Sequence, residues 1–161
     1  MTSFLTVDGE ELSLRRCLGY LRDAGQLAAF LGEILRQHLL QREIANRGIQ
    51  VSDTLIDIAV ADFCEQHELR DRAMLAEWLV AHDDTEAAML ERIRGEYRLE
   101  RLKHAVTSPE LEQYFLDRRP FLGDDPPASL SDPELRKALR EELFERWIGE
   151  RLERLTVELH D

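Results

Sequence analysis

Hydrophobic residues recur every three or four positions along almost the whole chain, which is the spacing of one face of an α-helix. In the segment from Gln26 to Arg47, for example, the stripe includes Leu27, Leu31 and Ile34. The pattern breaks at residue types that end or begin helices, such as Gly, Pro and a capping Ser, Thr or Asp. We therefore expect an all-α fold with helices over residues 13–24, 26–47, 53–68, 70–82, 85–106, 109–119 and 133–155.

A chain of 161 residues is long enough for one domain with its own hydrophobic core. Residues 123–133 hold three of the five prolines and few large apolar side chains, which indicates a flexible loop. We expect a single helical domain, residues 1–161, in which helical segments over 1–122 are followed by this loop and by a returning helix and strand over 134–161. The apolar stripe of the last helix is broader than a surface helix needs, so several earlier helices should pack on it.

The tripeptide Leu-Thr-Val stands near both ends of the chain, at residues 5–7 and 155–157. Both stretches are β-branched and lie outside the helical pattern. A last helix that lies across the first ones would bring them together, and we predict a short antiparallel ribbon that pairs residues 4–7 with 155–159. The alternative is that the two ends are separate tails. The dipeptide Asp8-Gly9 favours a tight turn directly after the first stretch.

The chain has 21 basic and 33 acidic residues, a formal net charge of -12 at pH 7. Because this excess repels phosphate backbones, nucleic acid is not an expected partner. No run of 18 apolar residues occurs, so no membrane partner is expected. The first residues turn acidic at once, unlike a secretory signal, which predicts a cytoplasmic protein. Cys17 and Cys64 lie in helical patterns and are expected to be reduced thiols.

The motifs that mark common reaction centres are absent from the sequence. There is no HExxH, GxSxG or CxxC motif and no glycine-rich phosphate loop. Glu100 and His104 stand four residues apart, but the Glu-x-x-His motifs of a di-metal helical bundle are missing. We therefore expect no metal ion and no cofactor.

Aromatic and titratable side chains in the amphipathic segments provide two sets of candidate site residues. Aromatic residues at helical spacing most often belong to a core, although a cavity between helices also exposes such side chains. For an enzyme, the catalytic candidates are Trp78, His82, Tyr97, Glu100 and His104. For a binding protein, the candidates for contact with a peptide are Trp78, Tyr114, Phe115, Phe121 and Leu122.

Several motifs follow one another in an order that is similar to that of a known family. They are the start VDGEELSL, the helix stop and restart RGIQVSD, the segment VTSPELEQYFLDRRPFL and the closing LRKALREELFERWIGERLERLTVEL. Together they resemble the helical N-terminal chaperone domain and the returning C-terminal helix of SurA-type, parvulin-class peptidyl-prolyl isomerases. In that family a parvulin catalytic domain lies between these parts, whereas only GDDPPASL separates them here. Because so short a segment cannot build a sheet with covering helices, the catalytic domain is missing and prolyl isomerase activity is not implied.

The resemblance implies a helical unit that holds extended or unfolded peptide segments. Together with the broad apolar stripes, it leads us to expect a non-catalytic, chaperone-like module for a peptide or protein client, with an acidic rim that favours basic segments. Two alternatives stay open. One is a small-molecule isomerase or cyclase of a biosynthetic pathway, built on the same helical cradle. The other is a homodimer whose apolar stripe serves self-association.

Overall fold

Helices make up most of the molecule, as the sequence predicts. The computed structural model describes residues 3–157. A short hairpin of β1 (Ser3–Val7) and β2 (Glu10–Ser13) precedes the helices, and a 3-10 turn, η1 (Arg119–Phe121), follows the sixth of them. The seven α-helices of the described residues are α1 (Leu14–Asp23), α2 (Leu27–Asn46), α3 (Asp53–Gln66), α4 (Arg72–Ala81), α5 (Glu86–Thr107), α6 (Leu111–Arg118) and α7 (Pro133–Leu152).

Side-chain caps determine where most of these helices begin. A side-chain oxygen of the residue before each helix accepts a hydrogen bond from a backbone N–H of the first turn, which satisfies a donor that the helix itself leaves unpaired. The capping residues are Ser13, Ser52, Asp71, Thr85 and Asp132. Helix positions are therefore set by local sequence, and this is why the predicted boundaries agree with the observed ones to within a few residues.

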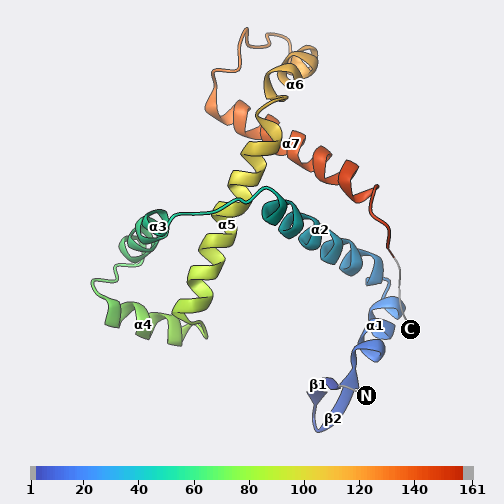
Figure 1. Cartoon of the computed structure of the whole chain (residues 1–161), viewed down its shortest axis with the longest axis vertical. Helices are drawn as coiled ribbons and strands as arrows, with labels where there is room; N and C mark the ends of the chain where they lie inside the picture. Colours follow the sequence, from blue (N-terminus) through green and yellow to red (C-terminus); the bar gives the residue numbers. More distant parts are fainter. Residues whose placement is uncertain (1–2, 158–161) are drawn as a thin grey trace.

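The helices are arranged as three arms around α5 (Figure 1). We call residues 3–38, with the hairpin, α1 and the first part of α2, the N-terminal arm. We call residues 53–91, with α3, α4 and the start of α5, the acidic arm. The third arm contains α6, the loop after it and the beginning of α7. The long helix α5 runs from the acidic arm to the centre, where α2 and α7 pack against it.

Three separate hydrophobic clusters hold these parts together. The central cluster joins α2, α5 and α7, the second joins α6 to α7, and the third joins α4 and α5, with side chains of α3 packed against it. Their buried members are Leu39, Leu40, Leu102, Phe144 and Ile148 in the central cluster, Leu111, Phe115, Leu130, Leu139 and Leu143 in the second, and Leu75, Leu79 and Met89 in the third. As expected, the last helix is packed on by several earlier ones, namely α2, α5 and α6.

The predicted ribbon between residues 4–7 and 155–159 is not present in the described residues. Strand β1 pairs instead with β2 in an antiparallel sheet of two strands, with Val7 opposite Glu10. Residues 155–157 belong to no strand, and 158–159 lie outside the described residues. Asp8 and Gly9 form the turn, with φ angles of 50° and 83°. Pairing with the neighbouring strand is favoured because closing a two-residue turn costs far less entropy than closing a loop of about 150 residues.

The arms leave an unusually large surface in contact with solvent. The accessible surface is 11963 Å² for a chain of 18.7 kDa, whereas a compact monomer of this mass exposes about 8300 Å². The difference arises because the buried residues are divided among three small, separate clusters, so that each cluster is surrounded by only a few helices. Among residues 3–157, no helix combines the length and the apolar character that crossing a bilayer requires.

Candidate functional site

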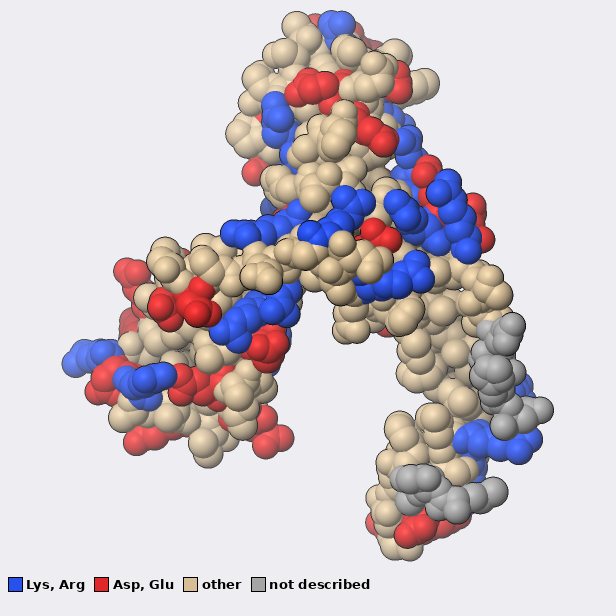
Figure 2. Space-filling view, viewed as in Figure 1, with Lys and Arg blue, Asp and Glu red and all other residues tan. Residues whose placement is uncertain are grey.

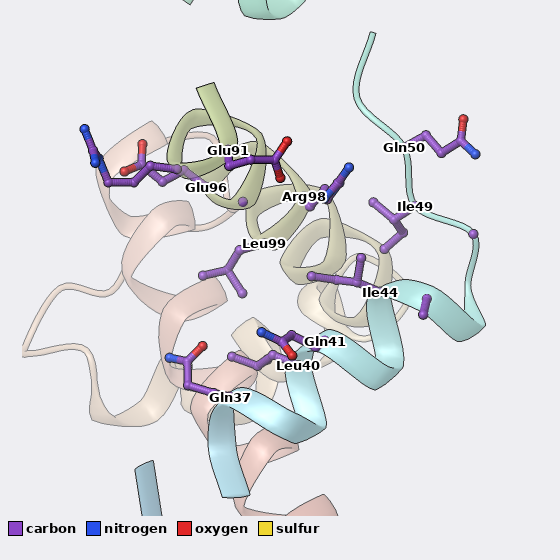
Figure 3. A pocket seen from close by; sticks show the side chains of 14 residues that line it. Gln37, Leu40, Gln41, Ile44, Ile49, Gln50, Glu91, Glu96, Arg98 and Leu99 are labelled. Carbon is purple, nitrogen blue, oxygen red and sulfur yellow. The ribbon is translucent and has the colours of Figure 1, made fainter. Parts of the chain in front are cut away.

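A groove of about 950 Å³ lies between the second half of α2 and the first half of α5, closed at one end by residues 48–50 (Figure 3). Apolar side chains form its floor, with Leu40 and Ile44 contributed by α2 and Leu99 by α5. Ile49 adds to the floor from the segment that follows α2. Behind this floor lies the central cluster, on which Ile44, Ile49 and Leu99 pack. The groove therefore has a rigid apolar base.

The segment that closes the groove is held in place by backbone interactions. Helix α2 ends at Asn46, and Gly48, two residues later, has a φ of 60° that favours glycine. The N–H of Ile49 then donates to the carbonyl oxygen of Ile44 at 3.1 Å. The guanidinium of Arg101 donates to the carbonyl oxygen of Gln50. Together these bonds fix the chain across α5, so the groove is a preformed feature of the fold.

Gly95 keeps the α5 side of the groove open. It lines the groove in the middle of α5, and a Cβ placed on it would meet no other atom within 4 Å. Glycine at such a position lowers helix stability by about 1 kcal/mol relative to alanine. Packing does not demand glycine here, because the space in front of it is empty. The residue therefore contributes room to the groove.

Polar side chains surround the apolar floor. They come from both helices and from the closing segment, and they are Gln37, Gln41, Gln50, Glu91, Arg92, Glu96 and Arg98. Arg92 is committed to Asp84, with 2.6 Å between its guanidinium and the carboxylate, and this hydrogen bond lowers the pKa of Asp84. Within residues 3–157, the side chains of Gln41, Gln50 and Arg98 have no hydrogen-bond or ion-pair partner. Their donors and acceptors are therefore available to a ligand in the groove.

Ion pairs anchor the helix that carries half of the groove. The carboxylate of Glu43, on the far side of α2, is only 7 % exposed and lies 3.4 Å from Arg47 and 3.6 Å from Arg151 of α7. Earlier in α2, the guanidinium of Arg36 donates two hydrogen bonds, of 2.8 and 2.6 Å, to Glu145 of α7. These contacts fix α2 to α7 and thereby fix one wall of the groove.

Charge is distributed unevenly around the groove. The acidic arm has eleven acidic and two basic residues, so it holds nine of the twelve net negative charges. Figure 2 shows red side chains along this arm, and blue ones where the segment after α2 crosses α5. A ligand that enters the groove from the side of the acidic arm therefore meets a negative potential first.

The structure does not bring the five catalytic candidates together. Trp78 and His82 stack in the acidic arm with ring centroids 3.8 Å apart, and Nδ1 of His82 lies 2.7 Å from the carbonyl oxygen of Trp78. Tyr97 and Glu100 line a separate hollow of about 390 Å³. His104 lines another one of about 310 Å³, which Glu100 also lines. The candidates are thus divided among three places, and none of the five lines the groove.

The candidates for peptide contact are also scattered. Phe115 is 2 % exposed and belongs to the second cluster, so it is a core residue with no surface for a peptide. Tyr114 and Leu122 pack at the edge of the same cluster. The hydroxyl of Tyr114 donates to Glu142 at 3.1 Å, and burial together with this bond raises the pKa of Tyr114. Phe121, in contrast, is 76 % exposed, as its place next to Pro120 suggested.

Most residues of the groove were missed by the sequence-based reasoning. Ile44, Gly95 and Leu99 were assigned to helices without any role, because apolar residues at helical spacing look the same in a core and in a groove floor. One signal was present: the segment RGIQVSD combines a helix stop with two apolar residues that no helix would cover. A second signal was Gly95, because glycine in the middle of a long helix lowers the stability of that helix.

Comparison with known proteins adds no family to this picture. No protein-family model, no curated protein and no solved structure matches the chain. Within the described residues, no group of three or more His, Cys, Asp or Glu side chains has the arrangement of a metal site.

Proposed function

We propose that the protein is a non-catalytic, chaperone-like module that binds an extended segment of a peptide or protein client in the groove between α2 and α5. The observation that carries this proposal is the combination of an apolar floor with free polar groups along the rim of a preformed groove. Such a combination suits an extended chain, because apolar side chains enter the floor while backbone amides meet the polar rim.

The shape of the groove favours a chain segment over a small compact ligand. Its volume of about 950 Å³ lies at the upper end of the range for small-molecule pockets, and it opens to solvent and is not an enclosed cavity. The amide groups of Gln41 and Gln50 can each donate and accept, which matches the alternating N–H and C=O groups of an extended backbone. The resemblance to the SurA-type helical chaperone domain supports the same kind of ligand.

The acidic arm supports a preference for clients that carry Lys or Arg next to apolar residues. Eleven acidic residues over residues 53–91 attract such segments and speed their arrival at the groove. The rim itself is balanced, with Glu91 and Glu96 against Arg92 and Arg98. Charge thus selects the client on approach, whereas the apolar floor holds it.

The test is the binding of fluorescently labelled unfolded peptides, measured by anisotropy, to the wild-type protein and to Gly95→Leu. A leucine at position 95 projects into the groove and occupies its floor. We expect a loss of affinity of at least about tenfold, which corresponds to about 1.4 kcal/mol. Gly149→Leu is the matched control, because Gly149 is also a glycine in a long helix with open space around it and lies outside the groove.

Two outcomes would contradict the proposed function. One is the absence of saturable binding for every peptide, basic and apolar ones included. The other is an equal loss of affinity in Gly95→Leu and Gly149→Leu, which would place the peptide elsewhere. Far-UV circular dichroism of both variants shows whether the helices are kept.

A further inference from the structure

The N-terminal arm is the one arm without a hydrophobic core. From Phe4 to His38 no residue is buried, although the arm contains a hairpin, all of α1 and more than half of α2. Seven of the thirteen large apolar side chains that are exposed in the described residues lie in this arm. In the space-filling view its visible surface is mostly neither acidic nor basic (Figure 2). The arm thus combines many exposed apolar side chains with the absence of a buried residue between Phe4 and His38.

The apolar residues of this arm form a stripe with helical spacing. On α2 the stripe consists of Leu27, Leu31, Ile34 and Leu35, with Phe30 beside them. Ile34 is 48 % and Phe30 41 % exposed, and the other three are half-buried. Such a stripe marks the face that a helix packs against another element. Within residues 3–157, however, Phe30 and Ile34 stay exposed and belong to none of the three clusters.

The arm cannot account for its own stability. An isolated two-stranded hairpin is marginal in water, and so is a helix as short as α1, which has ten residues. Both are nevertheless extended well away from the central cluster (Figure 1). A partner that covers the stripe would supply the burial that the hairpin and the helix lack.

We propose that the N-terminal arm is a dimerisation surface, covered by the N-terminal arm of a second copy of this chain. The area fits, because the excess over a compact monomer is roughly 3700 Å² per chain, or about 7400 Å² for two copies, while the large interfaces of obligate homodimers bury about 2000–5000 Å² over both partners, so part of the excess is enough. The proposal does not depend on the groove between α2 and α5, which lies beyond the stripe on the other half of α2.

Charge explains why this arm, and not the acidic arm, meets its own copy. The N-terminal arm has five acidic and four basic residues, so its net charge is only -1. Two such arms approach each other with little repulsion. Two acidic arms, with nine net negative charges each, would repel one another strongly. A two-fold axis between N-terminal arms keeps the acidic arms apart and leaves both grooves accessible.

The experiment is the molar mass of the full chain in solution, from size-exclusion chromatography with light scattering over a range of concentrations. The wild-type protein should have twice the mass of one 18.7 kDa chain. Ile34→Glu should have the mass of one chain at the same concentration, because it places a charge in the stripe. Phe30→Glu should behave in the same way. The matched control is Val80→Glu, which places the same charge on a side chain that is 77 % exposed in the acidic arm and should leave the dimer intact.

Thermal unfolding gives a second readout. The Tm of the wild-type protein should rise with protein concentration, as that of a dimer does, and the Tm of Ile34→Glu should not. Neither Phe30 nor Ile34 belongs to any of the three clusters, so peptide binding in the groove should survive in both variants. That result separates loss of the dimer from loss of the fold.

Three results would overturn the proposal. The first is a wild-type protein that keeps the mass of one chain at every concentration. The second is a dimer that persists in both Ile34→Glu and Phe30→Glu. The third is a wild-type monomer whose peptide binding is lost in Ile34→Glu, which would assign the arm to the client.

Discussion

At the scale of single residues, Gly95 couples the openness of the groove to the stability of α5. Replacing it by alanine should raise the free energy of unfolding by about 1 kcal/mol, because alanine is the better helix former and its Cβ meets no atom within 4 Å. Urea unfolding followed by circular dichroism measures the change. A lower free energy of unfolding in Gly95→Ala would mean that the space in front of this residue is filled in solution.

Glu43 is the residue on which the attachment of α2 depends. It is buried between Arg47 and Arg151, and Glu43→Gln keeps its shape while removing its charge. We expect the free energy of unfolding to fall by about 1–3 kcal/mol, since hydrogen bonds to charged groups in partly buried sites are among the stronger ones.

The control for Glu43→Gln is Glu150→Gln. Glu150 pairs with Arg146 at 3.6 Å on the surface of α7, and its side chain is 56 % exposed. Exposed pairs of this kind contribute about 0–1 kcal/mol, so this variant should unfold almost like the wild type. Equal effects of the two substitutions in urea unfolding would show that burial of Glu43 adds nothing.

Residue chemistry alone could not identify the site. The sequence drew attention to aromatic and titratable side chains, and Trp78, Phe63 and His82 do form a ring cluster, but inside the acidic arm. The groove floor consists of Leu, Ile and Gly, which every helix of this protein contains. They form a site because of the way in which α2 packs against α5. That arrangement depends on contacts between residues far apart in the sequence.

At the scale of elements, local sequence signals were sufficient to predict where helices begin and end, but not which strands pair. The caps Ser52 and Thr85 and the break at Gly48 fix helix ends through bonds within a few residues. The partner of β1 was a different problem, since the Leu-Thr-Val repeat favoured the C-terminal stretch. Asp8-Gly9 indicated a turn directly after β1, and the strand that follows this turn is the partner found in the described residues.

The pair of Arg36 and Glu145 links two elements in a way that depends on pH. The hydrogen bond from Arg36 lowers the pKa of Glu145 in the folded protein. Because the folded state holds this carboxylate ionised more readily than the unfolded state does, its contribution is present above the unfolded pKa, about 4.3, and is lost as pH falls through the folded pKa. The effect is modest, below about 1 kcal/mol, because the side chain of Glu145 is half exposed.

The measurement is the free energy of unfolding at pH 7 and at pH 3 for the wild type and for Glu145→Gln. Since glutamine does not titrate, the variant should lose less stability on acidification than the wild type loses. Raising the salt concentration at pH 7 should narrow the difference between the two proteins, because the pair is accessible to counter-ions. Identical pH profiles would contradict a stabilising role of this ion pair.

At the scale of the whole molecule, the extended shape is the feature that the sequence did not predict. Periodicity shows which face of a helix is apolar but not what covers that face. The stripe of Leu31 and Ile34 was therefore indistinguishable from the stripe of Leu139 and Leu143, although only the second is buried. A single domain was expected, but not one whose three clusters are small and separate. The same ambiguity leaves open, from sequence, whether the cover is a client or a second chain.

Hydrogen exchange of backbone amides should reveal this division directly. Local opening needs less energy where few side chains are buried, so protection should follow the clusters. The slowest amides are expected around Leu39 and Leu102, which are fully buried in the central cluster. The amides of the N-terminal arm should exchange fastest when the protein is dilute and monomeric.

At concentrations where dimers form, the exchange of the N-terminal arm should slow while that of the central cluster stays the same, because the second copy covers only the arm. Protection of the N-terminal arm that equals that of the central cluster in the dilute monomer would show that the arm has a cover within its own chain.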